Sequence, residues 1–86
     1  MFGISKNSPY RELLIDLICA INHIVPMSME NQALIVITLD TEEKIIRFKD
    51  WVQSKLRPNN QLDTTEKEIM SVVTAYIRLG REIPEE

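Results

Sequence analysis

Prolines mark the ends of the most strongly patterned segment in this chain, and that segment constrains the fold most. Ser8 followed by Pro9 is typical of a helix start, because the serine hydroxyl accepts free amide groups and proline suits the first helical position. Pro26 predicts the end of the helix, since the residue before a proline avoids helical backbone angles. Between them, apolar residues recur at intervals of three and four, which predicts an amphipathic helix over residues 9–25. Its expected core face consists of Tyr10, Leu13, Leu14, Leu17, Ile18, Ile21, Ile24 and Val25.

A further helix is predicted over residues 41–56. Asp40 and Glu43 have the spacing of a capping box, and Thr41 is an alternative N-cap. A Pro-Asn-Asn sequence at residues 58–60 then indicates a loop. The expected core stripe of this helix is Ile45, Phe48, Val52 and Leu56.

The last predicted helix covers residues 64–80, again from capping residues and apolar spacing. Gly80 is expected to close it, because glycine readily takes the left-handed conformation that follows many helices. The candidate capping pairs are Asp63 with Glu66 and Thr65 with Glu68, and the expected core face is Ile69, Val72, Val73, Tyr76, Leu79 and Ile83.

Residues 27–39 allow two interpretations. An apolar run with four β-branched side chains, at residues 33–39, fits either a buried strand or a buried short helix. A single strand would leave its backbone groups unpaired, so it would need residues 2–5 or a second chain as its partner. Ser28 has the character of an N-cap, and we therefore favour a short buried helix over residues 29–38.

The length of 86 residues suits one domain and is too short for two. We expect a single helical domain over residues 1–86, folded as an all-α, small irregular helical bundle. The alternative is an α+β fold in which a short strand at residues 33–39 pairs within the chain or across a dimer.

A cytoplasmic location is expected. The single cysteine excludes an intrachain disulfide framework and fits a reducing compartment. Residues 1–8 lack the long apolar core of a secretory signal. The most apolar stretch, residues 13–25, contains Asp16, Asn22 and His23 and is too short to predict a membrane span.

Potential metal ligands lie along one stripe of the first predicted helix, opposite its core face. Cys19 and His23 have the spacing to chelate Zn²⁺ or to support imidazole-assisted thiol chemistry. The four side chains are spread over successive turns along about 16 Å of the helix, so they cannot all surround one metal ion. We therefore favour a solvated or interface-facing polar stripe and predict no metal site. The members of the stripe are Glu12, Asp16, Cys19 and His23, with spacings of four, three and four.

The helix over residues 41–56 is apolar over more of its circumference than a surface helix needs. Ile46 and Trp51 flank its core stripe and widen the apolar arc. Residues 27–39 could cover this excess; otherwise Trp51 anchors an interface with a partner or with a second copy. Ile46 and Trp51, together with Phe48, are therefore the candidate interface residues.

Nucleic-acid binding is disfavoured by charge. Ten lysines and arginines against thirteen aspartates and glutamates give a net charge of −3, which disfavours binding to the phosphate backbone of nucleic acids. The basic residues of 41–56 scatter around the helix among acidic ones, as on a solvated face. No zinc-finger spacing, recognition-helix signature or aromatic RNA-binding motif accompanies them.

The possible functions are narrowed mainly by the absence of known catalytic and ligand-binding motifs. The chain contains no Gly-rich phosphate loop, nucleophile elbow, HExxH motif or EF-hand loop, so we predict no catalytic residue, no cofactor and no small-molecule ligand. The leading hypothesis is a cytosolic, non-enzymatic module for protein–protein interaction or regulation, which presents the Ile46/Trp51 region or the stripe of the first helix to a partner or to a second copy. The alternatives are a metal- or thiol-dependent enzyme or sensor that uses Cys19 and His23, and a nucleic-acid-binding helical protein.

Overall fold

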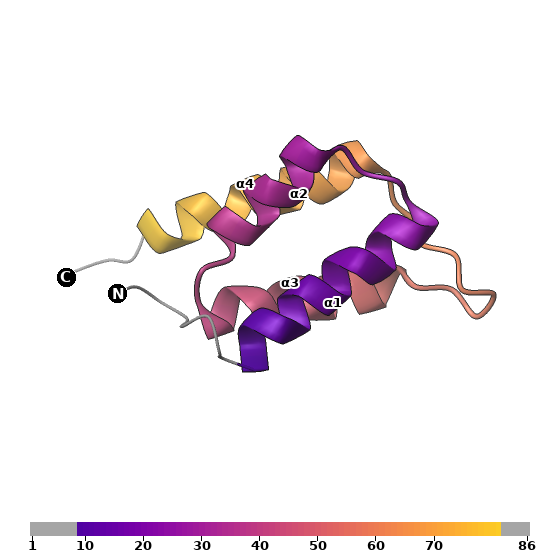
Figure 1. Cartoon of the computed structure of the whole chain (residues 1–86), viewed down its shortest axis with the longest axis horizontal. Helices are drawn as coiled ribbons and strands as arrows, with labels where there is room; N and C mark the ends of the chain where they lie inside the picture. The colour runs from indigo at the N-terminus through magenta and orange to yellow at the C-terminus, as the bar shows by residue number, and fades with distance from the viewer. Residues whose placement is uncertain (1–8, 82–86) are drawn as a thin grey trace.

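The computed structural model describes residues 9–81, with side chains for residues 9–77, and this part of the chain folds into four helices (Figure 1). The prediction of an all-α, small helical bundle is confirmed, and each helix end lies within two residues of the predicted one. The helices are α1 (Pro9–Ile24), α2 (Met29–Thr38), α3 (Glu42–Lys55) and α4 (Glu66–Arg81).

The four helices form two adjacent pairs. Figure 1 shows α2 beside α4 in one pair and α1 beside α3 in the other. Helix α1 also contacts α2, and α3 also contacts α4, so each helix has two neighbours. Helices α2 and α3 lie diagonally opposite and do not pack directly against each other.

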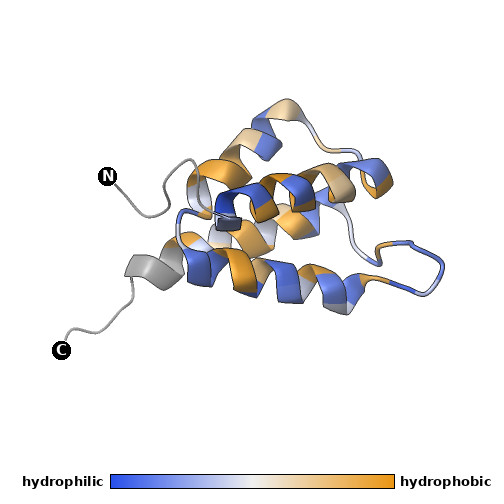
Figure 2. Ribbon diagram, turned by 60° about the horizontal axis from the view of Figure 1, so that its bottom comes forward, coloured by the Kyte–Doolittle hydropathy of each residue, from blue (hydrophilic) through white to orange (hydrophobic). Residues whose placement is uncertain are grey.

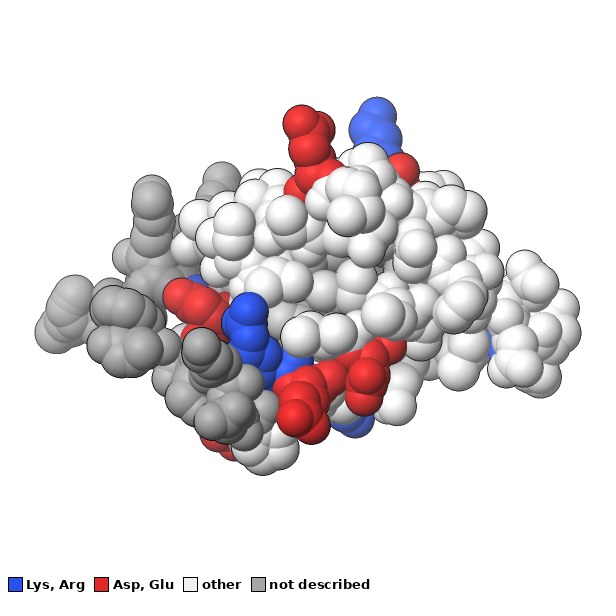
Figure 3. All heavy atoms as spheres, viewed as in Figure 1, with Lys and Arg blue, Asp and Glu red and all other residues white. Residues whose placement is uncertain are grey.

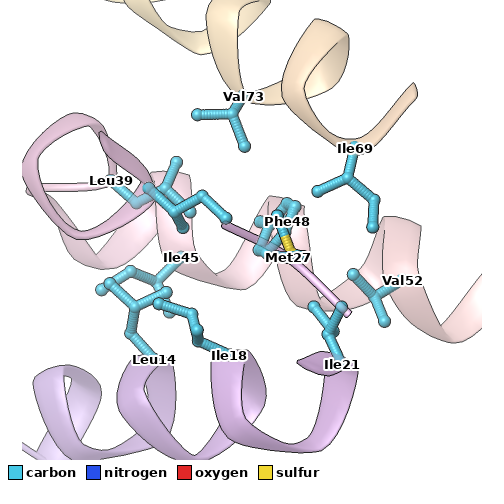
Figure 4. Packing of buried hydrophobic residues seen from close by; sticks show 11 residues of the cluster. Leu14, Ile18, Ile21, Met27, Leu39, Ile45, Phe48, Val52, Ile69 and Val73 are labelled. Atoms are coloured by element: carbon cyan, nitrogen blue, oxygen red, sulfur yellow. The ribbon is translucent and has the colours of Figure 1, made fainter. Parts of the chain in front are cut away.

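A single apolar core fills the space between the helices (Figure 4). Part of the predicted core face of α1 is fully buried, and most of the remainder packs against the core while partly exposed. Burying apolar side chains from all four helices provides the main stabilisation of the fold. The buried residues are Leu14, Ile18, Ile21, Met27, Ile35, Leu39, Ile45, Phe48, Val52, Ile69 and Val73.

The segment at residues 27–39 contains a helix, so the alternative strand at residues 33–39 is wrong. Ser28 is the N-cap of α2, and its hydroxyl accepts the backbone N–H of Asn31 at 3.1 Å. The backbone groups of the apolar run are satisfied within the helix, which removes the need for a second strand. The proposed strand partner, residues 2–5, lies outside the described residues.

Helix α2 is not the buried helix that its composition suggests. Ile35 and Thr38 are buried, but the side chain of Met29 is 79% exposed and that of Ile37 is 70% exposed. The physical reason is its position in the bundle. Helices α1 and α4 cover part of α2, while α3 lies diagonally opposite, so one apolar side of α2 faces outward.

The N-cap of α3 is Thr41 and not Asp40. The Thr41 hydroxyl accepts the backbone N–H of Lys44, whereas the Asp40 carboxylate pairs with the Lys44 ammonium at 3.0 Å. At its other end α3 stops at Lys55. Leu56, predicted to lie on the core stripe, is 45% exposed.

The loop between α3 and α4 is closed by local pairing. An isolated antiparallel bridge joins Leu56 to Leu62, and Arg57 pairs with Asp63. Asn60 has a φ of 64°, a left-handed conformation that asparagine tolerates better than most residues. Figure 2 shows that this loop is mostly hydrophilic, whereas hydrophobic and hydrophilic segments alternate along the helices.

A reciprocal capping box begins α4. The Thr65 hydroxyl accepts the backbone N–H of Glu68, and the Glu68 carboxylate accepts the backbone N–H of Thr65. Of the two predicted capping pairs, Thr65 with Glu68 is therefore the one that forms. The helix continues through Gly80 to Arg81, so Gly80 does not close it.

Candidate functional site

An open apolar groove lies between α1 and α2, and we call it the α1–α2 groove. Its volume is about 250 Å³. Helical spacing brings its residues together, because side chains three and four positions apart project from the same side of a helix. The groove is lined by Ile15, Ile18 and Cys19 of α1 and by Met29, Gln32, Ala33 and Val36 of α2.

The groove presents mainly apolar atoms to solvent. Ile15 is 44% exposed and lies in the same groove as the more exposed Met29, while Ile18 is buried. The Gln32 side-chain amide donates to the backbone carbonyl of Met27 at 3.0 Å, so it already has a partner. Ala33 contributes only a methyl group and leaves room between its larger neighbours. The surface is therefore suited to contacts with apolar side chains.

A second hollow, lined by both apolar and charged residues, adjoins the groove toward the end of α2. It has a volume of about 260 Å³ and shares Val36 with the α1–α2 groove, so the two hollows adjoin. The strongly exposed Ile37 also lines it, and Leu34 on the same helix is exposed. The remaining lining residues are Arg11, Leu14, Leu39, Asp40 and Ile45.

Three exposed carboxylates accompany the apolar surface on these two helices. Glu12 and Asp16 are on α1, and Glu30 is on α2. None of them has an ion-pair partner within the described residues, where the ion pairs all involve α3 or the loops that flank it. Figure 3 shows a broad area without charged side chains on the face formed by α1 and α2, with acidic side chains at its edges. We call Glu12, Asp16 and Glu30 the acidic rim.

The four residues of the predicted polar stripe of α1 are all exposed. Glu12, Asp16, Cys19 and His23 all face solvent, and Cys19 also lines the α1–α2 groove. Among residues with described side chains, no group of three or more His, Cys, Asp and Glu is arranged to hold a metal ion. Of these four residues, Cys19 lines the groove and the other three do not.

The interface candidates of α3 differ in exposure. Phe48 is 0% exposed and belongs to the core, so its side chain is not accessible to a partner in this fold. Trp51 is partly exposed, stacks on Phe48 with ring centroids 6.2 Å apart, and has the Lys55 ammonium 5.8 Å from its ring. Ile46 is partly exposed beside Arg47. Helix α2 is not a neighbour of α3, which packs against α1 and α4, so α2 itself does not cover the excess apolar arc.

Two of the residues that line a wider hollow between α2 and α4, Asn31 and Glu66, make a structural contact. One oxygen of the Glu66 carboxylate accepts the Ser28 backbone N–H at 2.9 Å and the Asn31 side-chain amide at 2.8 Å. These donors stabilise the charged form and hold the pKa of Glu66 below its ordinary value. The carboxylate therefore connects the N-terminal turns of α2 and α4, and its hydrogen bonds serve this structural contact.

The α1–α2 groove was not predicted from the sequence, although two signals for it are present. Ile15 falls outside the predicted core face of α1, and it lies one turn before Cys19. A short helix that is apolar on several sides requires cover on more than one of them. The sequence does not indicate which side of α2 the other helices leave open.

Comparison of the chain with known protein families, curated proteins and solved structures found no match. No described helix has both the length and the hydropathy that a membrane crossing requires. Any functional conclusion therefore rests on the geometry of the described residues.

Proposed function

We propose that this protein is a non-enzymatic interaction module that docks an apolar helix of a partner protein in the α1–α2 groove. The outward apolar side of α2 carries this proposal. Met29 and Ile37 are far more exposed than the other large apolar side chains of the described region, and the groove lies directly beside Met29. Contiguous exposed apolar surface of this kind marks interaction sites more often than isolated apolar residues do.

The shape of the groove favours a protein side chain over a small molecule. Its volume of about 250 Å³ is below the roughly 300–1,000 Å³ that is usual for small-molecule pockets. An open groove between two helices matches the mode in which an amphipathic helix inserts anchors at i, i+3, i+4 and i+7. Ile15 and Met29 would contact those anchors.

The chemistry of the groove supports a binding role rather than catalysis. Its functional groups are the thiol of Cys19 and the amide of Gln32, and no carboxylate or imidazole lines it. General acid–base or assisted thiol chemistry requires a titratable group within hydrogen-bonding reach of the reacting atom. An exposed, single cysteine is also compatible with a reducing, cytoplasmic setting.

A synthetic helical peptide tests the proposal directly. The probe is a neutral peptide of about four turns with leucines at i, i+3, i+4 and i+7 and with alanine, glutamine and serine elsewhere. It is titrated into the ¹⁵N-labelled full chain and followed by amide chemical shifts. We expect the largest changes in α1 and α2, clustered around Ile15 and Met29.

Substitutions at two equally exposed residues, one inside and one outside the groove, provide the control for peptide binding. Ile15 lies in the groove and Leu56 lies outside it, at 44% and 45% exposure. Ile15→Gln should weaken peptide binding by about fivefold or more, as for a contact worth roughly 1 kcal/mol, while Leu56→Gln should leave it unchanged. Shifts centred on Ile46 and Trp51 would instead favour α3 as the interface. Absence of shifts in α1 and α2 would contradict docking in the groove.

Self-association is the second candidate, because the same apolar surface could be covered by another copy. Light scattering after size-exclusion chromatography, over a range of concentrations, measures it. A mass that doubles with concentration in the wild type but not in Ile15→Gln would identify the groove as a homodimer interface.

A further inference from the structure

We propose that the helix docked in the α1–α2 groove carries lysine or arginine residues beside its apolar anchors. The inference rests on the proposed function and concerns the chemistry of the partner. It derives from the acidic rim of Glu12, Asp16 and Glu30, which is separate from the apolar lining of the groove.

The rim residues lie on the outward side of both helices. On α1, Asp16 follows the groove residue Ile15 directly, and Glu12 lies one turn before it. On α2, Glu30 follows Met29 directly. At 100° per residue, Glu12 and Asp16 lie within about 60° of the groove residue Cys19 and away from the core-facing positions of α1. On α2, Glu30 lies about 60° from the groove residue Ala33 and about 80° from the buried Thr38. A helix in the groove would therefore lie between acidic edges.

These carboxylates remain available to a partner because nothing in the described part of the chain neutralises them. Asp40, Glu43, Asp50 and Asp63 each pair with a lysine or arginine. The rim residues have no such pair among the described residues. Apart from the rim, the only charged side chain of α1 and α2 is Arg11, which lines the second hollow. The other titratable groups of these two helices are Tyr10, the groove residue Cys19, and His23, which is exposed near the end of α1.

The same charges disfavour a second copy as the occupant. In a twofold dimer, the same surface patch is used by both subunits, so acidic rims would approach each other. The whole chain carries a net charge of −3, which adds repulsion between copies. A helix with basic flanks is opposite in charge to the acidic rim and would be attracted to it. This attraction would act mainly by raising the association rate.

The experiment compares helical peptides that share one apolar face but differ in their flanks. Lysine-flanked, neutral and glutamate-flanked versions are titrated into the full chain at about 50 mM and about 500 mM NaCl, a range over which the screening length shortens severalfold. At low salt the lysine-flanked peptide should bind about five- to tenfold more tightly than the neutral one, and the glutamate-flanked peptide more weakly. High salt should reduce these differences.

A pair of double variants separates the rim from overall charge. Glu12→Gln with Asp16→Asn removes two rim carboxylates, and Glu43→Gln with Asp50→Asn removes two carboxylates of α3. Both change the net charge equally, and circular dichroism confirms that each variant is folded. The lysine preference should largely disappear in the rim variant and persist in the α3 variant.

The outcomes distinguish this inference from the proposed function. Equal binding of all three peptides, with shifts in the groove, would overturn the basic partner and leave docking intact. Equal loss of preference in both double variants would also overturn it, because net charge alone would then be responsible. Binding of none of the peptides, or occupation of the groove by a second copy at working concentration, would overturn both proposals.

Discussion

Glu66 accepts a hydrogen bond from the backbone N–H of Ser28 at 2.9 Å, although the two residues lie 38 positions apart in the chain. The same carboxylate oxygen accepts the side-chain amide of Asn31. These contacts fix the first turn of α2 against the first turn of α4. Met29 lies between the two donors in the chain, so this clamp also positions one edge of the α1–α2 groove.

Replacing this carboxylate should lower stability in a pH-dependent way. Hydrogen bonds from Ser28 and Asn31 lower the folded pKa of Glu66, so its contribution is fully present above the ordinary pKa and is lost as the pH falls through the folded value. Glu66→Gln should therefore be less stable than the wild type at neutral pH, and the difference should shrink in acid. Urea denaturation between about pH 7 and pH 3, which spans the ordinary carboxyl range, measures it.

Glu30→Gln is the matched control for this prediction. Glu30 is an exposed carboxylate in the first turn of α2, without an ion-pair partner among the described residues. Its removal should not reproduce the pH-dependent loss. If the stability difference between wild type and Glu66→Gln grew on acidification, the clamp would not act through the charged carboxylate.

Local signals in the sequence were enough to predict three of the four helices, and for residues 29–38 they favoured a helix over a strand. Caps act within one turn of the helix they start, so neighbouring residues alone identified Ser28 as an N-cap candidate and placed the start of α4 at one of two capping pairs, of which Thr65 with Glu68 forms. Pro26 likewise acts on the residue before it. These interactions do not depend on how the helices pack, which explains why the fold class was predictable.

The candidate site depends on packing and could not be read from local patterns. Ile35 and Ile37 are the same residue type, two positions apart in one apolar run, yet one is buried and the other is mostly exposed. They lie about 200° apart around the helix, and the packing of α1 and α4 against α2 decides which of the two sides is buried. The contact between Glu66 and Ser28 is likewise invisible locally, since it joins segments far apart in the chain.

Thr41 and Asp40 should differ in their contribution to stability. Thr41→Ala removes the N-cap of α3 and should cost about 1 kcal/mol, within the roughly 0.5–2 kcal/mol observed for such caps. Asp40→Ala removes only an exposed ion pair with Lys44 and should cost about 0.5 kcal/mol or less. Chemical denaturation of the two variants measures both values. A larger effect at Asp40 would mean that the aspartate caps the helix in solution.

Phe48 should behave as a core residue rather than as an interface residue. Its complete burial predicts that Phe48→Ala lowers the free energy of unfolding by about 3–5 kcal/mol. Ile46→Ala, two residues earlier at a partly exposed position, should cost about 1 kcal/mol or less. Thermal or urea unfolding tests both. A small effect at Phe48 would contradict its place in the core and restore it as a surface candidate.

Ile35 and Ile37 test whether α2 keeps an open apolar side in the free protein. Ile35→Ala should cost about 2–5 kcal/mol, because it leaves a cavity in the core. Ile37→Ala should change the free energy of unfolding by about 0.5 kcal/mol or less, since its side chain already contacts water. Urea denaturation gives both numbers in the same helix. If Ile37→Ala were as costly as Ile35→Ala, the outward side of α2 would already be covered, and no surface would remain there for a partner.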